Sequence, residues 1–166
     1  MNYLQTYGGE HLGGVVLVDA VIAFRPEFLP SAPLLPALGS SDLQIRSRGI
    51  VQFLRACFLQ QPDEKDFEEM VAFNGMVPLV AQLSIQQMST PDPAAVLSAL
   101  KLPVLIVYGA EDRLVSSGMA KYAHELLSSS RLDPIHESGH APFYEQSARF
   151  NSDLGHFLHA SAGQNR

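Results

Sequence analysis

Two short apolar runs constrain the fold of this chain more than any other feature. The first is "VVLV" within residues 13–20, where three β-branched residues and a leucine lie between glycines and an aspartate. The second runs from Val104 to Tyr108 and ends at Gly109. Continuous apolar runs of this length are typical of strands that are buried on both faces, as in a parallel sheet.

The segment between these runs has mainly helical patterns. Residues 1–7 are predicted to form the end of a helix. Residues 24–41 carry several prolines, and their apolar residues have no clear period, which predicts an ordered loop. Helical spacing then predicts four helices within residues 42–100. Asp92 is the expected N-cap of the last of them, with Pro93 at its first position.

Three further elements follow the second apolar run. Residues 118–127 are expected to form a helix and residues 131–140 a short strand that leads into a turn. Residues 145–160 have an amphipathic helical pattern, with Phe150, Leu154, Phe157 and Leu158 expected on one face. The order of strand, helical insert, strand, helix, strand and helix predicts an α/β architecture.

Composition and charge exclude several functional classes. The net charge is −6 and lysine plus arginine total only 11, without a basic run, which argues against a nucleic-acid partner. No apolar segment approaches the roughly 20 residues needed to span a bilayer. The opening "MNYLQTYGGE" lacks the pattern of a signal peptide, so a cytoplasmic protein without a membrane partner is expected.

Candidate functional residues lie just after the predicted strands. In an open parallel sheet, functional groups gather beyond the carboxyl ends of the strands, where Asp19, Asp112 and His140 are expected. Gly139 and Pro142 flank the histidine region, so the imidazole would be held at a loop tip, where it can move protons near neutral pH. The alternative is an exposed loop histidine without a function.

Asp112 is the preferred partner for this histidine. A carboxylate there could accept a hydrogen bond from the imidazole, fix its tautomer and stabilise the imidazolium. Only a loop and a helix separate its strand from His140, whereas Asp19 lies on the earlier strand. Both aspartates also have a simpler interpretation as turn-forming residues.

The other reactive side chains give no sign of a metal or cofactor site. Cys57 is the only cysteine, which excludes an internal disulfide, and its apolar surroundings predict a core thiol. No dinucleotide-binding glycine motif is present, so no cofactor is implied. The remaining histidines have no metal-like arrangement and are expected at the surface: His11, His124, His136, His156 and His159.

Two motifs together resemble the carboxyl-terminal half of the α/β-hydrolase fold family. The stretch "LPVLIVYGAEDRLV" ends in Gly109–Asp112, which matches the family's G-x-x-D strand end, where the triad acid lies. His140 follows Asp112 by 28 positions in "SGHAPFYEQ", which is similar to the family's histidine segment S-G-H-x-P-x-x-E. The matching positions of that segment are Ser138, Gly139, His140, Pro142 and Glu145.

The resemblance covers essentially the whole chain and implies its division into parts. Residues 1–23 would hold a helix end and the first strand of the hydrolase core, and residues 24–92 the helical cap. Residues 93–166 would hold the core that carries the acid and the histidine. The expected fold is therefore α/β, with the last three parallel strands of a hydrolase sheet and a cap inserted after the first of them.

One part of the family pattern is missing. The family's nucleophile lies on a G-x-S-x-G turn between a strand and a helix, and it precedes the acid and the histidine. Neither "LGSSD" nor "VSSGM" has the required flanking glycines, and no segment matches the one that supplies oxyanion-hole amides. The chain is expected to begin after its own nucleophile, as an incomplete fold with little or no hydrolysis by itself.

The resemblance implies hydrolysis of a small, hydrophobic acyl or ester substrate, with Asp112 and His140 as catalytic residues. Apolar residues of the cap are expected to line the pocket or form the cap core: Phe53, Phe58, Phe67, Met70, Phe73 and Met76. The family also includes dehalogenases, epoxide hydrolases and cofactor-free perhydrolases. In an alternative interpretation, the chain is a shortened, non-catalytic relative whose first strand pairs with a complementing chain or with a second copy.

Overall fold

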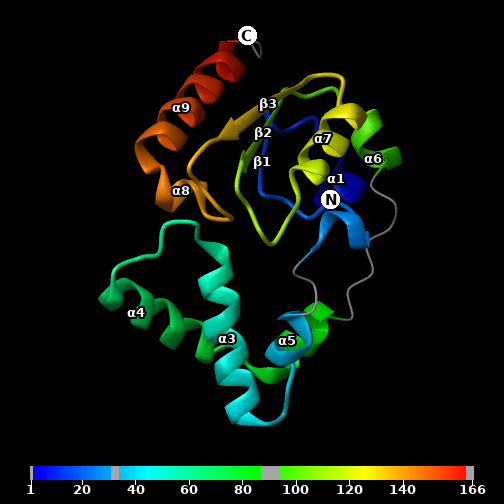
Figure 1. The fold of residues 1–166 in the computed structure, drawn as a ribbon. Helices are drawn as coiled ribbons and strands as arrows, with labels where there is room; N and C mark the ends of the chain where they lie inside the picture. The colour runs from blue at the N-terminus through cyan, green and yellow to red at the C-terminus, as the bar shows by residue number, and fades with distance from the viewer. Residues whose placement is uncertain (1, 31–33, 87–93, 164–166) are drawn as a thin grey trace.

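The computed structural model describes residues 2–30, 34–86 and 94–163. Its sheet has three parallel strands in the order β1-β2-β3 (Figure 1): β1 Val15–Val18, β2 Val104–Gly109 and β3 Ser130–Ile135. Val104 pairs with Val15 on one side and with Ser130 on the other. The parallel sheet predicted from the two apolar runs is thereby confirmed.

Helices cover both faces of this sheet (Figure 1). They are α1 Asn2–Tyr7, α6 Ala94–Ala99, α7 Ser117–Leu126, α8 Pro142–Glu145 and α9 Ser147–Gly163. Ile106 of β2 belongs to the same apolar cluster as Met119 of α7, whereas Leu105 belongs to a second cluster with Phe157 of α9. Because successive side chains of β2 point into these two clusters, every residue of the strand is buried.

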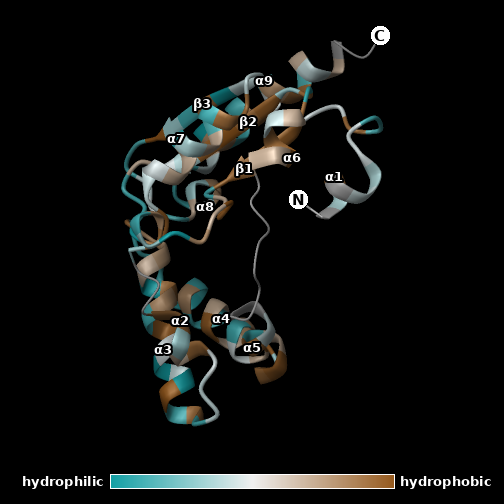
Figure 2. Cartoon of the chain, turned by 90° about the vertical axis from the view of Figure 1, so that its right-hand side faces the viewer, coloured by the Kyte–Doolittle hydropathy of each residue, from teal (hydrophilic) through white to brown (hydrophobic). Residues whose placement is uncertain are grey.

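Four helices between β1 and β2 form a group that we call the helical insert, which Figures 1 and 2 show apart from the sheet. The insert consists of α2 Leu35–Leu38, α3 Leu43–Cys57, α4 Glu64–Gly75 and α5 Leu79–Gln86. The short 3-10 helix Pro26–Phe28, which precedes it, packs instead against α7 beside the sheet, where Phe28 contacts Tyr122. Asp42 caps α3 by accepting hydrogen bonds from two backbone amides, and Asp63 caps α4 from one. Leu38, Ile50 and Phe67 belong to the insert's own small core.

Most of the elements predicted from the sequence are present. Helices α3 to α6 confirm the four helices expected within residues 42–100, although Asp92 and Pro93 lie outside the described residues. Residues 24–41 were expected as a loop, but they contain the short 3-10 helix and α2. Both short helices have a proline in their first turn, where proline favours helix initiation although the segment has no periodic pattern.

The apolar face of α9 is narrower than its sequence pattern predicted. Phe150 and Phe157 pack against the sheet as expected. Leu158, however, is 54% exposed, because it lies about 100° around the helix from Phe157 and so beyond the line of contact. Among the helices that the structure describes, none is long and apolar enough to cross a membrane.

Candidate active site

Asp112 and His140 lie together at the carboxyl ends of the strands. Asp112 follows β2 by three residues, and His140 lies in the loop between β3 and α8. The imidazole Nδ1 of His140 is 2.8 Å from Oδ2 of Asp112, which is the distance of a strong hydrogen bond. The structure therefore joins the two residues that the sequence had singled out.

The Asp112 carboxylate is fixed in place. Its Oδ1 accepts hydrogen bonds from the backbone amides of Leu114, at 2.7 Å, and Val115, at 3.1 Å. These bonds aim Oδ2 at the imidazole, and the side chain is only 1% exposed. A carboxylate with so many fixed donors can orient the histidine and stabilise its protonated form.

His140 is suited to proton transfer. Burial lowers its pKa, but the hydrogen bond and charge of Asp112, helped by the charge of Asp19, outweigh this and raise the pKa above 6.5. Its side chain remains 27% exposed. Because Nδ1 donates to Asp112, Nε2 is the nitrogen that can accept a proton from an approaching group.

The backbone after β2 contacts the loop that carries the histidine. The amide of Glu111 donates to the carbonyl of Ser138, and the Ser138 amide donates to the Glu111 carboxylate. A side chain at Gly109 would overlap the carbonyl oxygen of Gly139. Its Cβ would also lie 2.6 Å from the carbonyl oxygen of Ser138. The glycine of the G-x-x-D pattern is thus required by this close approach.

Comparison with solved structures identifies the fold. A putative aryl esterase from Burkholderia cenocepacia is similar with a TM-score of 0.91 and 35% identity, over 98% of this chain and 60% of that one. The esterase RhEst1 from Rhodococcus sp. ECU1013 has a TM-score of 0.85 and 22% identity, over 95% of this chain and 59% of that one. The chain belongs to the α/β-hydrolase superfamily.

Comparison of sequences agrees with this assignment. The chain is 30% identical to the pimeloyl-[acyl-carrier protein] methyl ester esterase of Neisseria meningitidis over 131 residues, which are 75% of this chain and 50% of that protein. It is 38% identical over 61 residues to the AB hydrolase superfamily protein YisY of Bacillus subtilis, covering 37% of this chain and 23% of that one. No family model matches. The chain spans about half the length of the esterase relative, and thus part of a hydrolase fold.

Asp19, the alternative acid in the sequence, lies in the same site as Asp112 and His140. Its Oδ1 accepts a hydrogen bond of 3.0 Å from the Gly109 amide, while Oδ2 is buried without a partner among the described residues. The backbone at Asp19 has a φ of 41°, in the left-handed region that aspartate tolerates better than most residues. Ligand atoms of Asp19, Asp112 and His140 all lie within 4.8 Å of one another.

This cluster is better suited to sharing protons than to binding a metal. Asp112 and His140 already form a hydrogen bond with each other, which a cation between them would have to break. Burial, followed by the charge of Asp112, raises the pKa of Asp19 from 3.8 to about 7. Near neutral pH, Asp19 therefore holds a proton for part of the time.

We expect Asp19→Asn to remove a pH dependence of stability. Folding favours the protonated form of Asp19, because its pKa rises from 3.8 to about 7. The resulting stabilisation is fully present below about pH 4 and is lost as the pH rises toward about 7. Asparagine mimics the protonated acid, so the variant should be more stable than the wild type at about pH 8, by roughly 2–4 kcal/mol.

Urea denaturation from about pH 4 to about pH 8 measures this difference. Asp42→Asn is the matched control, because Asp42 is an exposed helix cap and asparagine caps equally well. If the free energy of unfolding changed with pH in the same way in Asp19→Asn and in the wild type, Asp19 would be ionised over this whole pH range, contrary to our expectation.

Sequence reasoning missed the role of Glu145. The residue matched the family's histidine segment, but no contact could be assigned to it. In the structure its Oε1 accepts from the amide of Gly139, and its Oε2 accepts from the amides of Leu59 and Gln60. These partners are up to 86 positions away, and only the motif itself indicated that a glutamate was needed.

The remaining reactive residues lie as the sequence predicted. Cys57 is a free, buried thiol, whose pKa is raised to about 12 by burial and by the charges of Asp112 and Glu145. Its carbonyl oxygen accepts a hydrogen bond of 2.8 Å from the His140 amide. The other histidines are all exposed: His11, His124, His136, His156 and His159.

The apolar residues expected at a pocket are divided between core and surface. Phe58 and Phe67 are buried core residues, whereas Phe73 and Met76 are 68% and 76% exposed. Phe53 and Met70 are half-buried beside the apolar clusters. Phe73 and Met76 are therefore not in the core of the helical insert.

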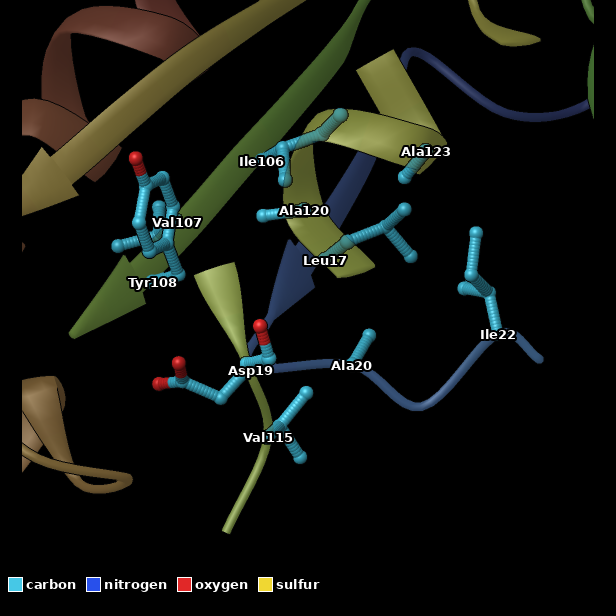
Figure 3. Close-up of a pocket in the computed structure, with 11 residues that line it drawn as sticks. Leu17, Asp19, Ala20, Ile22, Ile106, Val107, Tyr108, Val115, Ala120 and Ala123 are labelled. Atoms are coloured by element: carbon cyan, nitrogen blue, oxygen red, sulfur yellow. The ribbon is translucent and has the colours of Figure 1, made fainter. Parts of the chain in front are cut away.

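A cavity beside Asp19 is too small for a substrate. Figure 3 shows the apolar side chains around this aspartate, including those of Leu17, Ala20 and Val115. The volume of this cavity is about 10 Å³, which is close to the minimum for one water molecule. This cavity therefore cannot hold a substrate-sized molecule beside Asp19.

Proposed function

We propose that this chain supplies the acid and the histidine for serine-type hydrolysis of small, hydrophobic acyl or ester substrates. The observation that carries the proposal is the 2.8 Å hydrogen bond between His140 Nδ1 and the buried Asp112. The similarity to the putative aryl esterase supports it. The serine nucleophile would come from outside these 166 residues, because no G-x-S-x-G turn is present.

The proposed mechanism uses the two nitrogens of His140 in different ways. Nε2 takes the proton of the attacking serine hydroxyl as its oxygen bonds to the ester carbonyl carbon. Asp112 stabilises the resulting imidazolium through Nδ1. The imidazolium then gives its proton to the departing alcohol, and the acyl group remains bonded to the serine oxygen. Water releases the acid by the same steps, with His140 again as the base.

The division of the chain follows from this proposal. Residues 1–23 and 93–166 would form part of the hydrolase core, and residues 24–92 would form the cap over the substrate. The apolar cluster around Leu38 and Phe67 supports a cap with a small core of its own, which adjoins the core of the sheet at Phe53 and Met70. Ester hydrolysis is preferred over dehalogenation, epoxide hydrolysis or perhydrolysis because the 35% identical structure is described as a putative aryl esterase. A cytoplasmic location stays a prediction from the sequence.

Hydrolysis of p-nitrophenyl esters tests the proposal. The 166-residue chain alone should hydrolyse them no faster than buffer, because it has no activated nucleophile. The native protein, captured from its source cells with an antibody to this chain, should hydrolyse them readily. If the native protein were inactive, the proposed hydrolysis would be wrong. If the isolated chain were active, the nucleophile would have to lie within these 166 residues.

A second candidate function is pairing through the free edge of β1, as in a shortened, non-catalytic relative. Within the described residues, β1 pairs only with β2. The amides of Val15 and Asp19 donate to the β2 side, so those of Val16 and Val18 point toward the opposite edge. An apolar strand with such an edge can pair with a second copy or a complementing chain.

Replacing Val16 with proline tests this pairing. Proline removes the amide at the free edge without removing a hydrogen bond to β2. Sedimentation of the wild-type chain should show association that increases with concentration, and Val16→Pro should shift it to monomers. The control Val16→Thr keeps the amide and should associate like the wild type. A wild-type chain that stays monomeric at every concentration would exclude self-pairing.

A further inference from the structure

The loop that carries the histidine is attached to the helical insert. We call residues 136–141 the histidine loop and residues 58–63 the α3–α4 turn. The His140 amide donates to the carbonyl of Cys57, at the end of α3, and Gln60 Nε2 donates to the Glu137 carbonyl. A Cβ at Gly139 would lie 2.8 Å from the Leu59 amide nitrogen, so the two backbones are in direct contact.

Glu145 bridges these two segments with its carboxylate. Oε1 accepts from the Gly139 amide at 2.7 Å, one residue before His140. Oε2 accepts from the amides of Leu59 at 2.8 Å and Gln60 at 2.7 Å, both in the α3–α4 turn. Hydrogen bonds from amides to a carboxylate are short and strong, so the bridge ties the histidine loop to the insert.

The neighbouring residue adds a second connection. The Tyr144 hydroxyl donates to Oδ2 of Asp66 in the first turn of α4, at 2.6 Å. The ring of Tyr144 also packs edge-on against that of Phe58, with 5.6 Å between centroids. Helix α8 therefore contacts the insert on two consecutive residues, directly after the histidine loop.

Asp112, in contrast, is fixed by its own side of the site. Its carboxylate is held by the amides of Leu114 and Val115, in the loop between β2 and α7. The bond between Asp112 and His140 thus joins a carboxylate held after β2 to an imidazole whose loop is held by the insert. The histidine loop is also bonded to Glu111 through Ser138, so a displacement of the insert would pull on Gly139 and His140 against this anchor and strain the alignment with Asp112.

We propose that Glu145 is a positioning residue that makes the alignment of His140 with Asp112 depend on the position of the helical insert. Its catalytic meaning rests on the proposed function, since the aligned pair is the proton-transfer unit. Hydrogen bonds weaken steeply with distance and angle, so a shift of the α3–α4 turn would uncouple the pair. The pair is already aligned without a ligand, so a substrate that holds the insert against the histidine loop would keep it aligned during the reaction.

The test measures the titration of His140 by NMR in the 166-residue chain, with labelled histidine. Asp112 and Asp19 are the charged groups that raise the pKa of this imidazole. Glu145→Gln removes at least one of the acceptor sites of the bridge, which lets the histidine loop move away from Asp112. We expect the pKa of His140 to fall by about one unit or more, as when an opposite charge is withdrawn.

Glu137→Gln is the matched control. Glu137 is an exposed carboxylate in the same histidine loop, three positions before His140, and it contacts the insert only through its backbone carbonyl in the described structure. The control removes the same charge but leaves the bridge intact. The proposal predicts a clearly lower His140 pKa in Glu145→Gln than in Glu137→Gln, and equal values would overturn it.

A milder variant covers the case in which Glu145→Gln does not fold. The double variant Gln60→Ala with Tyr144→Phe removes two links between insert and loop without altering a charge. It should lower the His140 pKa in the same direction by a smaller amount, and a wild-type titration would contradict the proposal. Since no substrate is used, this result is independent of whether the native protein hydrolyses esters.

Discussion

Replacing Asp112 with asparagine should lower the rate of ester hydrolysis by the native protein about 10⁴-fold. The Asp112 side chain is 1% exposed and aims Oδ2 at His140 Nδ1. An asparagine held by the same amides of Leu114 and Val115 would present its NH₂ group to the imidazole. The imidazole would then carry its proton on Nε2, where it cannot act as the base.

Steady-state kinetics of p-nitrophenyl ester hydrolysis measure this loss. The variant should have a lower kcat and a nearly unchanged KM, because Asp112 acts through His140 and has no direct contact with the substrate in the proposed mechanism. Asp42→Asn makes the same chemical change at an exposed helix cap and should keep the wild-type rate. If Asp19→Asn lost the activity while Asp112→Asn kept it, Asp19 would be the acid and the assignment would be wrong.

Replacing Gly109 with alanine should lower the free energy of unfolding by about 3 kcal/mol. The new methyl group would overlap the carbonyl oxygen of Gly139 and would lie 2.6 Å from that of Ser138. Both contacts are to backbone, which cannot move aside as a flexible side chain can. The end of β2 and the histidine loop would have to separate, and the bond between Asp112 and His140 would be strained with them.

Urea denaturation gives the free energy of unfolding for this comparison. Gly155→Ala is the control, because Gly155 lies inside α9 and a Cβ there meets nothing within 4 Å. That control should raise the stability by about 0.5–1 kcal/mol, since alanine favours a helix interior. Similar stabilities for the two variants would show that the close approach at Gly109 is not needed.

The sequence predicted the features whose signals are local. The apolar runs predicted β1 and β2 because strands of a parallel sheet need uninterrupted apolar residues, although only β2 is buried throughout and β1 is half-buried. The position of Asp112 and His140 followed because parallel strands end at the same edge of the sheet. Their hydrogen bond then required only that β2 and β3 be neighbours, which the structure confirms.

Contacts that depend on three-dimensional packing could not be predicted. Asp19 joins the site because Val18 pairs with Val107 and so places the next residue beside Gly109. Sequence spacing does not determine that register. The Glu145 bridge to Leu59 joins positions 86 apart through a turn of the insert, whose docking no periodic pattern indicates. Both residues were visible as polar or motif positions, but their partners were not.

In the proposed mechanism, His140 and Asp112 act on a serine that lies outside these 166 residues. A fluorophosphonate probe, which bonds covalently to the activated serine of a serine hydrolase, tests it most directly. The native protein is captured from its source cells, labelled, digested and analysed by mass spectrometry. We expect one labelled serine, in a peptide absent from this sequence, and no labelling after His140→Ala. A labelled serine within residues 1–166, or an unlabelled native protein, would contradict it.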